Sequence, residues 1–309
     1  MKVNLKRKIL VVGYGQDGKI LHEQCIRNKE KIHIIVKDKT IKIEKEAFVK
    51  ILDIENKKTV FKYLKKFKNL DIYFLATSNI SSTQKERDDI FKKNFDSNIL
   101  GLKNFLDYMS LNINKKFKLF YASSSHIFEN SNLNIQDENT KKSYNSNYAF
   151  VKYLGLEICE FYRKEKKVFC SVGILYTHVS KYVNDNFLIK QLAIKIKNKN
   201  KNKNTVYVKN ANSKLDIMLA EDAVNAMQKI LKLDISHTFI ISSGKLVSIK
   251  KIFFYILKYY NLNHKINLKS RLTFSKRSSY LFGNNKKLLK KIKWKPNNNL
   301  KEIINEVLD

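Results

Sequence analysis

The sequence predicts an α/β fold in which a doubly wound parallel sheet carries a smaller C-terminal lobe. In the first half, short apolar runs alternate with amphipathic stretches, in the order strand then helix. The runs expected to form strands are residues 8–12, 32–36, 48–52, 71–76, 116–122 and 168–175. The helical stretches between them include residues 20–27, 57–67, 91–109 and 148–162. Such an alternation is typical of a parallel sheet with helices on both faces.

The pattern changes after residue 176. A helical run at 187–197 leads into the Asn- and Lys-rich segment 198–204, which we expect to be an exposed loop. Further strands are expected at 205–208 and 238–242, and helices at 220–231, 249–260 and 300–308. We expect residues 1–176, with returning segments near 212–245, to form the sheet domain. Residues 177–309 are then a smaller, mainly substrate-binding lobe.

The chain has 309 residues and a formal net charge of +33, which by itself favours a polyanionic partner. The positive charge is nearly all Lys, since Arg occurs at only six positions, and Asn and Ile are also frequent. Specific readers of nucleic acids use Arg forks and clustered basic faces, and neither is visible in the sequence. We therefore expect no nucleic-acid partner; a binder with steeply salt-dependent affinity is the alternative that this charge supports.

The cysteines and the N-terminus exclude several other classes. Cys25, Cys159 and Cys170 do not show the spacing of metal ligands or of a disulfide framework, so no metal is expected. The apolar run at 9–12 is far too short for a signal sequence or a membrane span. We therefore expect a cytoplasmic protein with reduced cysteines and no membrane partner.

A glycine-rich turn directly follows the first expected strand. Gly13, Gly15 and Gly18, with Gln16 and Asp17 before the last, stand where a strand gives way to a helix. Glycines in this place let the diphosphate of a dinucleotide approach the helix N-terminus, whose free N–H groups and dipole favour anions. A plain turn from strand to helix is the alternative. The position favours a cofactor-binding loop in a Rossmann-type domain.

The ends of the next strands predict further contacts to the dinucleotide. Lys37 and Asp38 end the second expected strand, where a cation favours the extra phosphate of NADP and an acid favours the ribose of NAD. We favour NADP over NAD. Asp53, followed by Ile54, is placed either to meet the adenine or to cap a helix. The expected cofactor contacts at the end of the fourth strand are Leu75, Ala76 and Thr77.

Hydroxyl groups follow the strand expected at 116–122. Ser124 and Ser125, followed by His126, stand at the carboxyl end of a central strand, beside the expected nicotinamide. Taken alone, such serines are turn residues. Tyr148 and Lys152 change this interpretation, because their four-residue spacing places a phenol and an ammonium on one helical face. An ammonium favours phenolate over phenol, so the pair can act as a base on a substrate hydroxyl that a serine also binds.

With these motifs the chain resembles the extended short-chain dehydrogenase/reductases that act on nucleotide sugars. These form the NAD-dependent epimerase/dehydratase family, and the chain is most similar to the GDP-mannose 4,6-dehydratases within it. The resemblance runs nearly end to end and includes residues 15–18, 71–76, 122–125, 148–152, 173–180, 214–216, 221–227, 243–248 and 294–296. It implies a nucleotide-sugar substrate and a homodimer or a higher homo-oligomer.

The resemblance also implies roles for single residues. Ser124 matches the catalytic Ser/Thr, Tyr148 the base, and Lys152 the residue that holds the cofactor ribose. The residues expected to border the sugar nucleotide are Ser125, Thr177, His178, Asn186 and Phe187.

The chain departs from the family pattern at three places that bear on function. The family's dehydratases carry a Glu two positions after the catalytic Ser/Thr, where this chain has His126. The glycine loop is one residue shorter, with only Tyr14 between its first two glycines. The Arg residues that grip nucleotide phosphates in the family are replaced by Lys181 and Tyr182.

His126 leaves more than one reaction open. An imidazole is a general base at neutral pH, and a C4 ketone acidifies the neighbouring C5 proton, so elimination of water can survive the replacement. We therefore expect a 4,6-dehydratase. The alternative is a 4-epimerase or a 4-keto-sugar reductase, in which His126 only binds a substrate hydroxyl. A packed, non-catalytic His126 and a catalytically silent Rossmann protein are the remaining interpretations, and intact Ser124, Tyr148 and Lys152 oppose the second.

Overall fold

The computed structural model describes most of the chain. The described residues are 7–41, 43, 47–77, 88–128, 135–198, 205–208, 211–262, 266–270, 281–297 and 299–309. The loop expected at 198–204 lies outside them except for Asn198.

A seven-stranded parallel sheet forms the centre of the molecule. Its strands are β1 (Lys8–Val12), β2 (Ile32–Val36), β3 (Ala47–Ile51), β4 (Asn69–Phe74), β5 (Lys116–Ser124), β6 (Cys170–Leu175) and β10 (Thr238–Ile241). They lie in the order β10-β6-β5-β4-β1-β2-β3, and every neighbouring pair is parallel. The order reverses at β1, and ligands of such sheets bind at this switch point. The predicted Rossmann-type doubly wound fold is confirmed.

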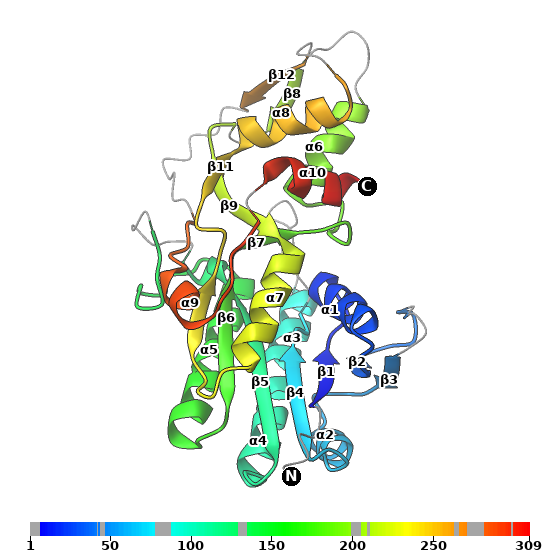
Figure 1. The fold of residues 1–309 in the computed structure, drawn as a ribbon, viewed down its shortest axis with the longest axis vertical. Coiled ribbons are helices and arrows are strands. Elements are labelled where there is room, and N and C mark those ends of the chain that lie inside the picture. The colour runs from blue at the N-terminus through cyan, green and yellow to red at the C-terminus, as the bar shows by residue number, and fades with distance from the viewer. Residues whose placement is uncertain are drawn as a thin grey trace.

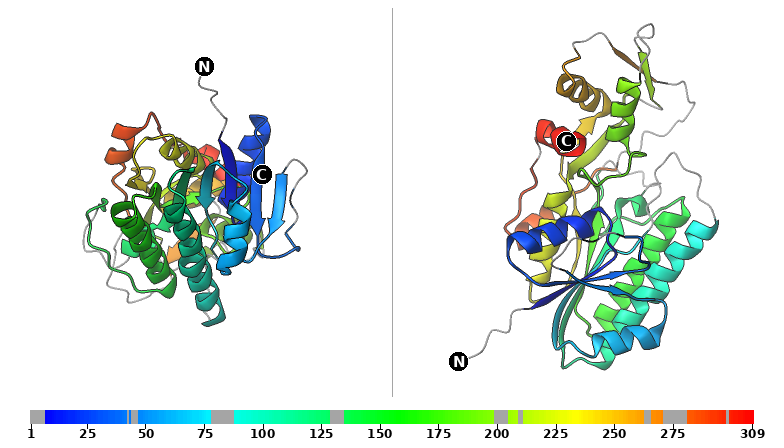
Figure 2. Two further views of the ribbon diagram at one scale, coloured as in Figure 1. Left: turned by 90° about the horizontal axis from the view of Figure 1, so that it is seen from below. Right: turned by 90° about the vertical axis from the view of Figure 1, so that its right-hand side faces the viewer.

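Helices cover both faces of the sheet, and each face has its own apolar core. One face carries α1 (Gln16–Arg27) and α7 (Ala220–Leu231). The other carries α2 (Lys57–Leu64), α4 (Leu102–Leu111) and α5 (Asn147–Glu165). Figure 2 shows the two helix layers on opposite sides of the sheet. Burial on both faces explains why the central strands are nearly continuous apolar runs.

The helix expected at 91–109 is interrupted. α3 (Asp88–Phe95) continues into a π-helical segment (Asp96–Gly101) before α4 begins. Single π-helical turns are rare and occur often at functional sites. Asn98 lies in this segment and is fully buried.

The second half of the chain builds a small lobe with a third apolar core. A three-stranded sheet contains β7 (Thr177–Val179), β9 (Lys214–Leu219) and β11 (Leu246–Ser248), and β8 (Thr205–Val208) pairs with β12 (Asn267–Ser270). The helices of the lobe are α6 (Leu188–Lys197), α8 (Ile249–Tyr259) and α10 (Leu300–Leu308), whereas α9 (Lys286–Lys291) lies beside β10. Figure 1 shows the lobe beyond the carboxyl ends of the sheet strands.

A buried carboxylate joins the lobe to the large sheet. Asp216 of β9 accepts hydrogen bonds from the backbone N–H groups of Ser243, Gly244 and Gly283, at 2.7, 3.2 and 3.3 Å. These residues follow β10 and precede α9, so one side chain holds three segments together. Burial raises the pKa of Asp216 to about 6, although the hydrogen bonds that it accepts act in the opposite direction.

Of the helices in the described ranges, none combines the length and the apolar character needed to cross a bilayer.

Candidate active site

A cleft of about 320 Å³, partly open to solvent, lies at the carboxyl edge of the sheet. The glycine loop, the ends of β4, β5 and β6, the first turns of α5 and the segment 177–187 all contribute to its lining. Parallel strands end at one edge, so residues far apart in the sequence meet there. Most of the predicted site residues line this cleft. They are Gly15, Gln16, Asp17, Gly18, Leu75, Thr77, Ser124, Ser125, His126, Tyr148, Lys152, Thr177 and His178.

The glycine loop packs closely against the segment that follows β4 and leaves open space at the start of α1. Gly13 has φ +98°, and a Cβ there would lie 2.7 Å from Cα of Ala76. A Cβ on Gly18 would lie 2.6 Å from the carbonyl oxygen of Gly13. Glycine at these two positions therefore lets the backbone of the loop pack against neighbouring backbone. Gly15 is different, because a Cβ there would meet nothing within 4 Å. Gly15 is also the N-cap of α1 and supplies no capping side chain, so the first N–H groups of the helix suit an anion.

The residues expected to contact the adenosine lie at the end of β2 and after β3. Lys37 pairs with Glu55 at 3.1 Å, and Asp38 accepts hydrogen bonds from the hydroxyl and the backbone N–H of Thr40, which lower its pKa. Asp53 accepts from the backbone N–H of Glu55 at 3.0 Å. The N-cap of α2 is Asn56 rather than Asp53, because the Asn56 side chain accepts from the N–H groups that follow it. The described residues that line the cleft do not include Lys37, Asp38, Asp53 or Ile54.

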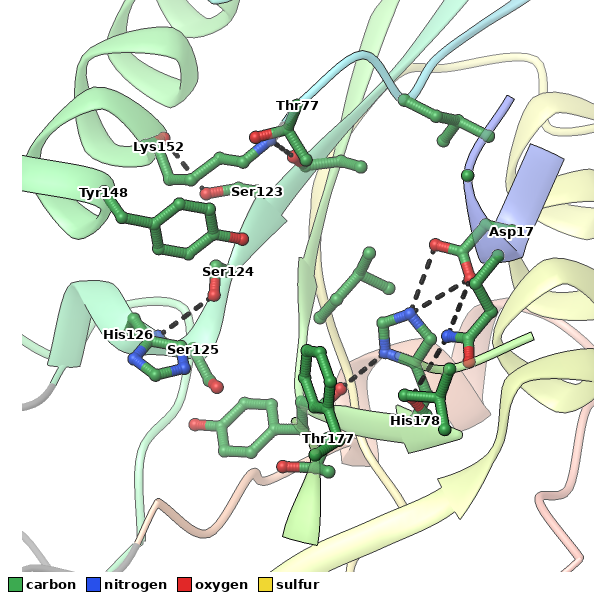
Figure 3. Close-up of a pocket in the computed structure, with 18 of the residues that line it drawn as sticks. Asp17, Thr77, Ser123, Ser124, Ser125, His126, Tyr148, Lys152, Thr177 and His178 are labelled. Atoms are coloured by element: carbon green, nitrogen blue, oxygen red, sulfur yellow. Dashed lines mark hydrogen bonds and ion pairs between the residues drawn. The ribbon is translucent and has the colours of Figure 1, made fainter. Parts of the chain in front are cut away.

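The serines after β5 have different surroundings. β5 continues to Ser124, two residues beyond its expected end, and a short 3₁₀ turn (Ser125–Phe128) follows. Ser123 donates to the backbone oxygen of Lys152 at 3.1 Å, which fixes α5 against the strand. The Oγ of Ser124 accepts from the backbone N–H of His126 at 3.3 Å. Figure 3 shows the Ser124 side chain between those of Tyr148 and His126.

Tyr148 and Lys152 occupy the first two turns of α5. Ser146 caps this helix by accepting from the N–H of Ala149. Lys152 is only 2% exposed, and its Nζ lies 6.0 Å from the centre of the Tyr148 ring. Burial lowers the pKa of Lys152 to about 7, although the Asp17 carboxylate acts in the opposite direction. The ring of His126 meets that of Tyr148 edge-on, with centroids 5.8 Å apart.

Asn98 anchors Lys152 and was missed by the sequence analysis. Its Oδ1 accepts from the Lys152 Nζ at 2.9 Å and from the Tyr121 hydroxyl at 3.1 Å, and its Nδ2 donates to the backbone oxygens of Ala76 and Asn94. The Lys152 Nζ also donates to the backbone oxygen of Ala122 at 2.9 Å. A signal was present, because residue 98 falls in the apolar series 91, 95, 98, 102, 105 of the predicted helix. A lone Asn in such a series must find a buried partner.

The opposite wall of the cleft joins α1 to β7. His178 Nε2 lies 3.1 Å from both carboxylate oxygens of Asp17, and Nδ1 lies 2.7 Å from the backbone oxygen of Tyr176. Gln16 donates to the backbone oxygen of His178 at 3.2 Å and accepts from the Ser180 hydroxyl at 3.1 Å. Figure 3 shows this wall facing the group that contains Tyr148 and Ser124.

The segment after β7 turns its long side chains toward α1. Lys181 pairs with Glu23 at 3.5 Å, and the Tyr182 hydroxyl donates to the same carboxylate. The lining of the cleft here comes from Tyr182, Val183, Asn184 and Phe187. Asn186, expected near the sugar nucleotide, is exposed, and the described lining residues do not include it.

Within the described ranges, no three His, Cys, Asp or Glu side chains come close enough to hold a metal.

The glycine loop at the switch point of a doubly wound sheet, facing a Ser/Tyr/Lys set, defines an extended short-chain dehydrogenase/reductase. Residues 10–307 match the sequence profile described as GDP-mannose 4,6 dehydratase, and the chain belongs to this family. The resemblance expected from the motifs is thereby confirmed.

Curated relatives are similar at low identity. GDP-mannose 4,6 dehydratase 2 of Caenorhabditis elegans is 25% identical over 271 residues, which cover 81% of this chain and 70% of that protein. GDP-mannose 4,6 dehydratase of Dictyostelium discoideum is 27% identical over 266 residues, 80% of this chain and 74% of that protein.

Solved structures share the fold at still lower identity. UDP-glucose 4-epimerase of Thermotoga maritima, solved with UDP-glucose, has a TM-score of 0.82 at 16% identity and covers 97% of both chains. dTDP-glucose 4,6-dehydratase of Bacillus anthracis, solved with NAD, has a TM-score of 0.78 at 16% identity and covers 97% of this chain and 96% of its own. An epimerase and a dehydratase thus share this fold, so the fold alone does not select the reaction.

Proposed function

We propose that the protein is a nucleotide-sugar 4,6-dehydratase that acts on a GDP-mannose-like substrate. The observation that carries this proposal is the position of His126. Its ring lies edge-on to Tyr148, and Ser124 lies between them. A base for the C4 hydroxyl and a base for the neighbouring C5 proton must reach adjacent carbons of one sugar. The 5.8 Å between the ring centres of Tyr148 and His126 supports their action as such a pair.

The residues of the cleft have separate roles in the proposed reaction. Tyr148 takes the proton of the C4 hydroxyl, and Ser124 donates a hydrogen bond to the same oxygen. The glycine loop and Lys152, which line the cleft, would hold a nicotinamide cofactor, and when bound it would supply the hydride acceptor for C4 and the hydride donor for C6, without net oxidation of the sugar. His126 removes the C5 proton that the C4 ketone has acidified and passes it to the C6 hydroxyl, which leaves as water. After hydride return to C6, C5 takes a proton from solvent, and Tyr148 releases to solvent the proton that it took from the C4 hydroxyl. The net change is the loss of one water, which gives a 4-keto-6-deoxy sugar.

We propose NADP ahead of NAD as the cofactor. Gly15 faces open space at the uncapped end of α1, so the loop suits a dinucleotide diphosphate. At the end of β2, the Asp38 carboxylate accepts hydrogen bonds from the N–H and hydroxyl of Thr40, whereas the Lys37 side chain is 69% exposed. Its surface ion pair with Glu55 is weak enough to exchange for a phosphate. We expect tighter binding of NADP⁺ than of NAD⁺ in calorimetric titrations, and the reverse order would contradict this choice.

A second function is supported by the same residue. The family's dehydratases carry a Glu where this chain has His126, and a C4 epimerase or a 4-keto-sugar reductase needs no base at C5. In that case His126 binds a substrate hydroxyl, and Tyr148 and Ser124 carry the whole reaction.

Mass analysis of the product separates the two functions. Incubation with GDP-mannose and related sugar nucleotides is expected to give a product lighter by one water. His126→Gln is expected to lower this dehydration about 10²- to 10⁴-fold, because it removes the base, while oxidation at C4 continues. His237→Gln, just before β10 and outside the lining of the cleft, is the matched control. An unchanged mass with altered stereochemistry would assign the wild type to the epimerases. A His126→Glu protein that gains dehydration would assign the wild type to the epimerase or reductase group.

A further inference from the structure

The first turn of α1 carries a carboxylate at the place where a diphosphate is expected. Asp17 follows Gly15 and Gln16 in the glycine loop and lines the cleft. A carboxylate there stabilises the helix dipole, but it also repels any anion that approaches the same N–H groups. His178, from the small lobe, is the side chain that the structure places against this carboxylate.

The hydrogen bonds of His178 determine its charge. The backbone oxygen of Tyr176, 2.7 Å from Nδ1, can only accept, so Nδ1 carries a proton. The ionised carboxylate of Asp17, 3.1 Å from Nε2, can also only accept, so Nε2 carries a second proton. The ring is therefore an imidazolium. Burial would lower the pKa of His178, but the Asp17 charge and the two hydrogen bonds outweigh burial and raise it.

We propose that His178 is a positioning residue for the cofactor: it holds Asp17 and cancels its charge, so that the first turn of α1 accepts a dinucleotide diphosphate. The proposal rests on the nicotinamide dinucleotide of the proposed function, but not on the sugar chemistry. It also explains why the ion pair bridges the two lobes, since Gln16 binds the backbone of His178 and the hydroxyl of Ser180 from the same turn. The cofactor loop and the start of the segment 177–187 therefore hold each other in place.

The other charged groups around His178 have partners of their own or lie across the cleft. Lys181 pairs with Glu23, whose carboxylate also binds Tyr182, and Lys19 lies over the Tyr182 ring. Two acidic residues of α7 also have partners: Glu221 pairs with Arg27, and Asp222 accepts a hydrogen bond from the backbone N–H of Asn297. Asp216 of β9 accepts hydrogen bonds from three backbone N–H groups. Lys152 and His126 line the far side of the cleft. Asp17 is thus the charge that His178 meets directly.

The test is the pH dependence of dinucleotide affinity, measured by calorimetric titration of the cofactor-free full-length protein with NAD⁺. The ratio of wild-type to His178→Gln affinity at each pH is the readout, because it removes the part of the pH dependence that the two proteins share. We expect a ratio of about ten near pH 6, which falls toward one near pH 9 as His178 loses its proton. Adenosine, which lacks the diphosphate, should give a ratio near one throughout.

Three further variants make the proposal falsifiable. In an Asp17→Asn background, His178→Gln should cost nothing, because no charge remains to be cancelled. His178→Lys, which keeps its charge over this range, should bind NAD⁺ as tightly as the wild type at pH 6 and more tightly than the wild type at pH 9. His237→Gln, at the other end of the sheet next to β10, is the matched control and should follow the wild type.

Either of two results would overturn the proposal. One is a wild-type to His178→Gln ratio that does not change with pH, and the other is an equal loss with and without Asp17. Both readouts are binding constants, so a protein that binds NAD⁺ normally but does not dehydrate sugars contradicts the proposed function and leaves this inference intact.

Discussion

Replacing Tyr148 with Phe is expected to slow oxidation at C4 about 10²- to 10⁴-fold while cofactor affinity and stability change little. The phenol faces the cleft beside Ser124 and is the group that can remove the C4 hydroxyl proton. Phe keeps the ring and therefore its edge-on packing against His126. The loss is thus confined to the proton transfer.

Single-turnover reduction of the bound nicotinamide, followed by its absorbance, measures this step. Tyr153→Phe is the matched control, because Tyr153 lies on the same helix and packs against Tyr144. Its phenol should be dispensable. A Tyr148→Phe protein that oxidises its substrate at the wild-type rate would show that another group is the base.

Replacing Lys152 with Met is expected to abolish most activity and to stabilise the cofactor-free fold. The ammonium lies 2.9 Å from the Oδ1 of Asn98 and from the backbone oxygen of Ala122, and no carboxylate of the described residues pairs with it. Met has similar length and no charge, so it removes the cost of burying the ammonium. We expect an increase in the free energy of unfolding of about 1–4 kcal/mol at pH 6. Activity should fall at least about 10²-fold, because Tyr148 loses the cation that favours phenolate.

The pH dependence of this stability difference has a definite sign. The pKa of Lys152 is about 7 in the folded protein and 10.5 in its ordinary environment. Between these values the unfolded chain binds one proton more than the native protein, so the stability of the wild type rises with pH by up to about 1.4 kcal/mol per unit. Below pH 7 both states are charged and the burial cost is fully present. The advantage of Lys152→Met should therefore be largest below pH 7 and shrink toward pH 10.5.

Chemical denaturation of the cofactor-free protein across this range measures the difference. Lys164→Met is the control, since this side chain is 85% exposed on the same helix. Its stability should stay within about 0.5 kcal/mol of the wild type at every pH. A Lys152→Met protein whose advantage is constant with pH would mean that Lys152 is not the group that titrates.

The large sheet was predictable because its signals are local. Four apolar residues in a row, such as 9–12, are expected to be buried on both faces of a sheet, and they lie in β1 as expected. The strands of the small lobe were harder to predict from the sequence. β7 and β11 have three residues each, and β9 lies in a segment that mixes Lys, Asp and Met, so no period could be detected. The division of the chain at residue 176 and the homo-oligomer stay predictions.

The candidate site was predictable in part, for a related reason. Ser124, Tyr148 and Lys152 could be found because their spacing on one strand end and one helix face is a sequence property, and their catalytic roles stay predictions. Asn98 was missed although it binds Lys152, because 54 residues separate the two in the chain. His178 was expected at the sugar nucleotide, whereas the structure also pairs it with Asp17, 161 residues away.

By itself, the sequence determined the parallel α/β sheet, the glycine loop after its first strand and the Tyr148/Lys152 pair on one helix face. Each depends on neighbours within a few residues, where backbone geometry alone sets which side chains share a face. Only the tertiary structure decided that Asn98 anchors the buried Lys152 and that His178 from the lobe meets Asp17. Burial and the distance between charged groups set protonation, and both arise only when distant segments pack together.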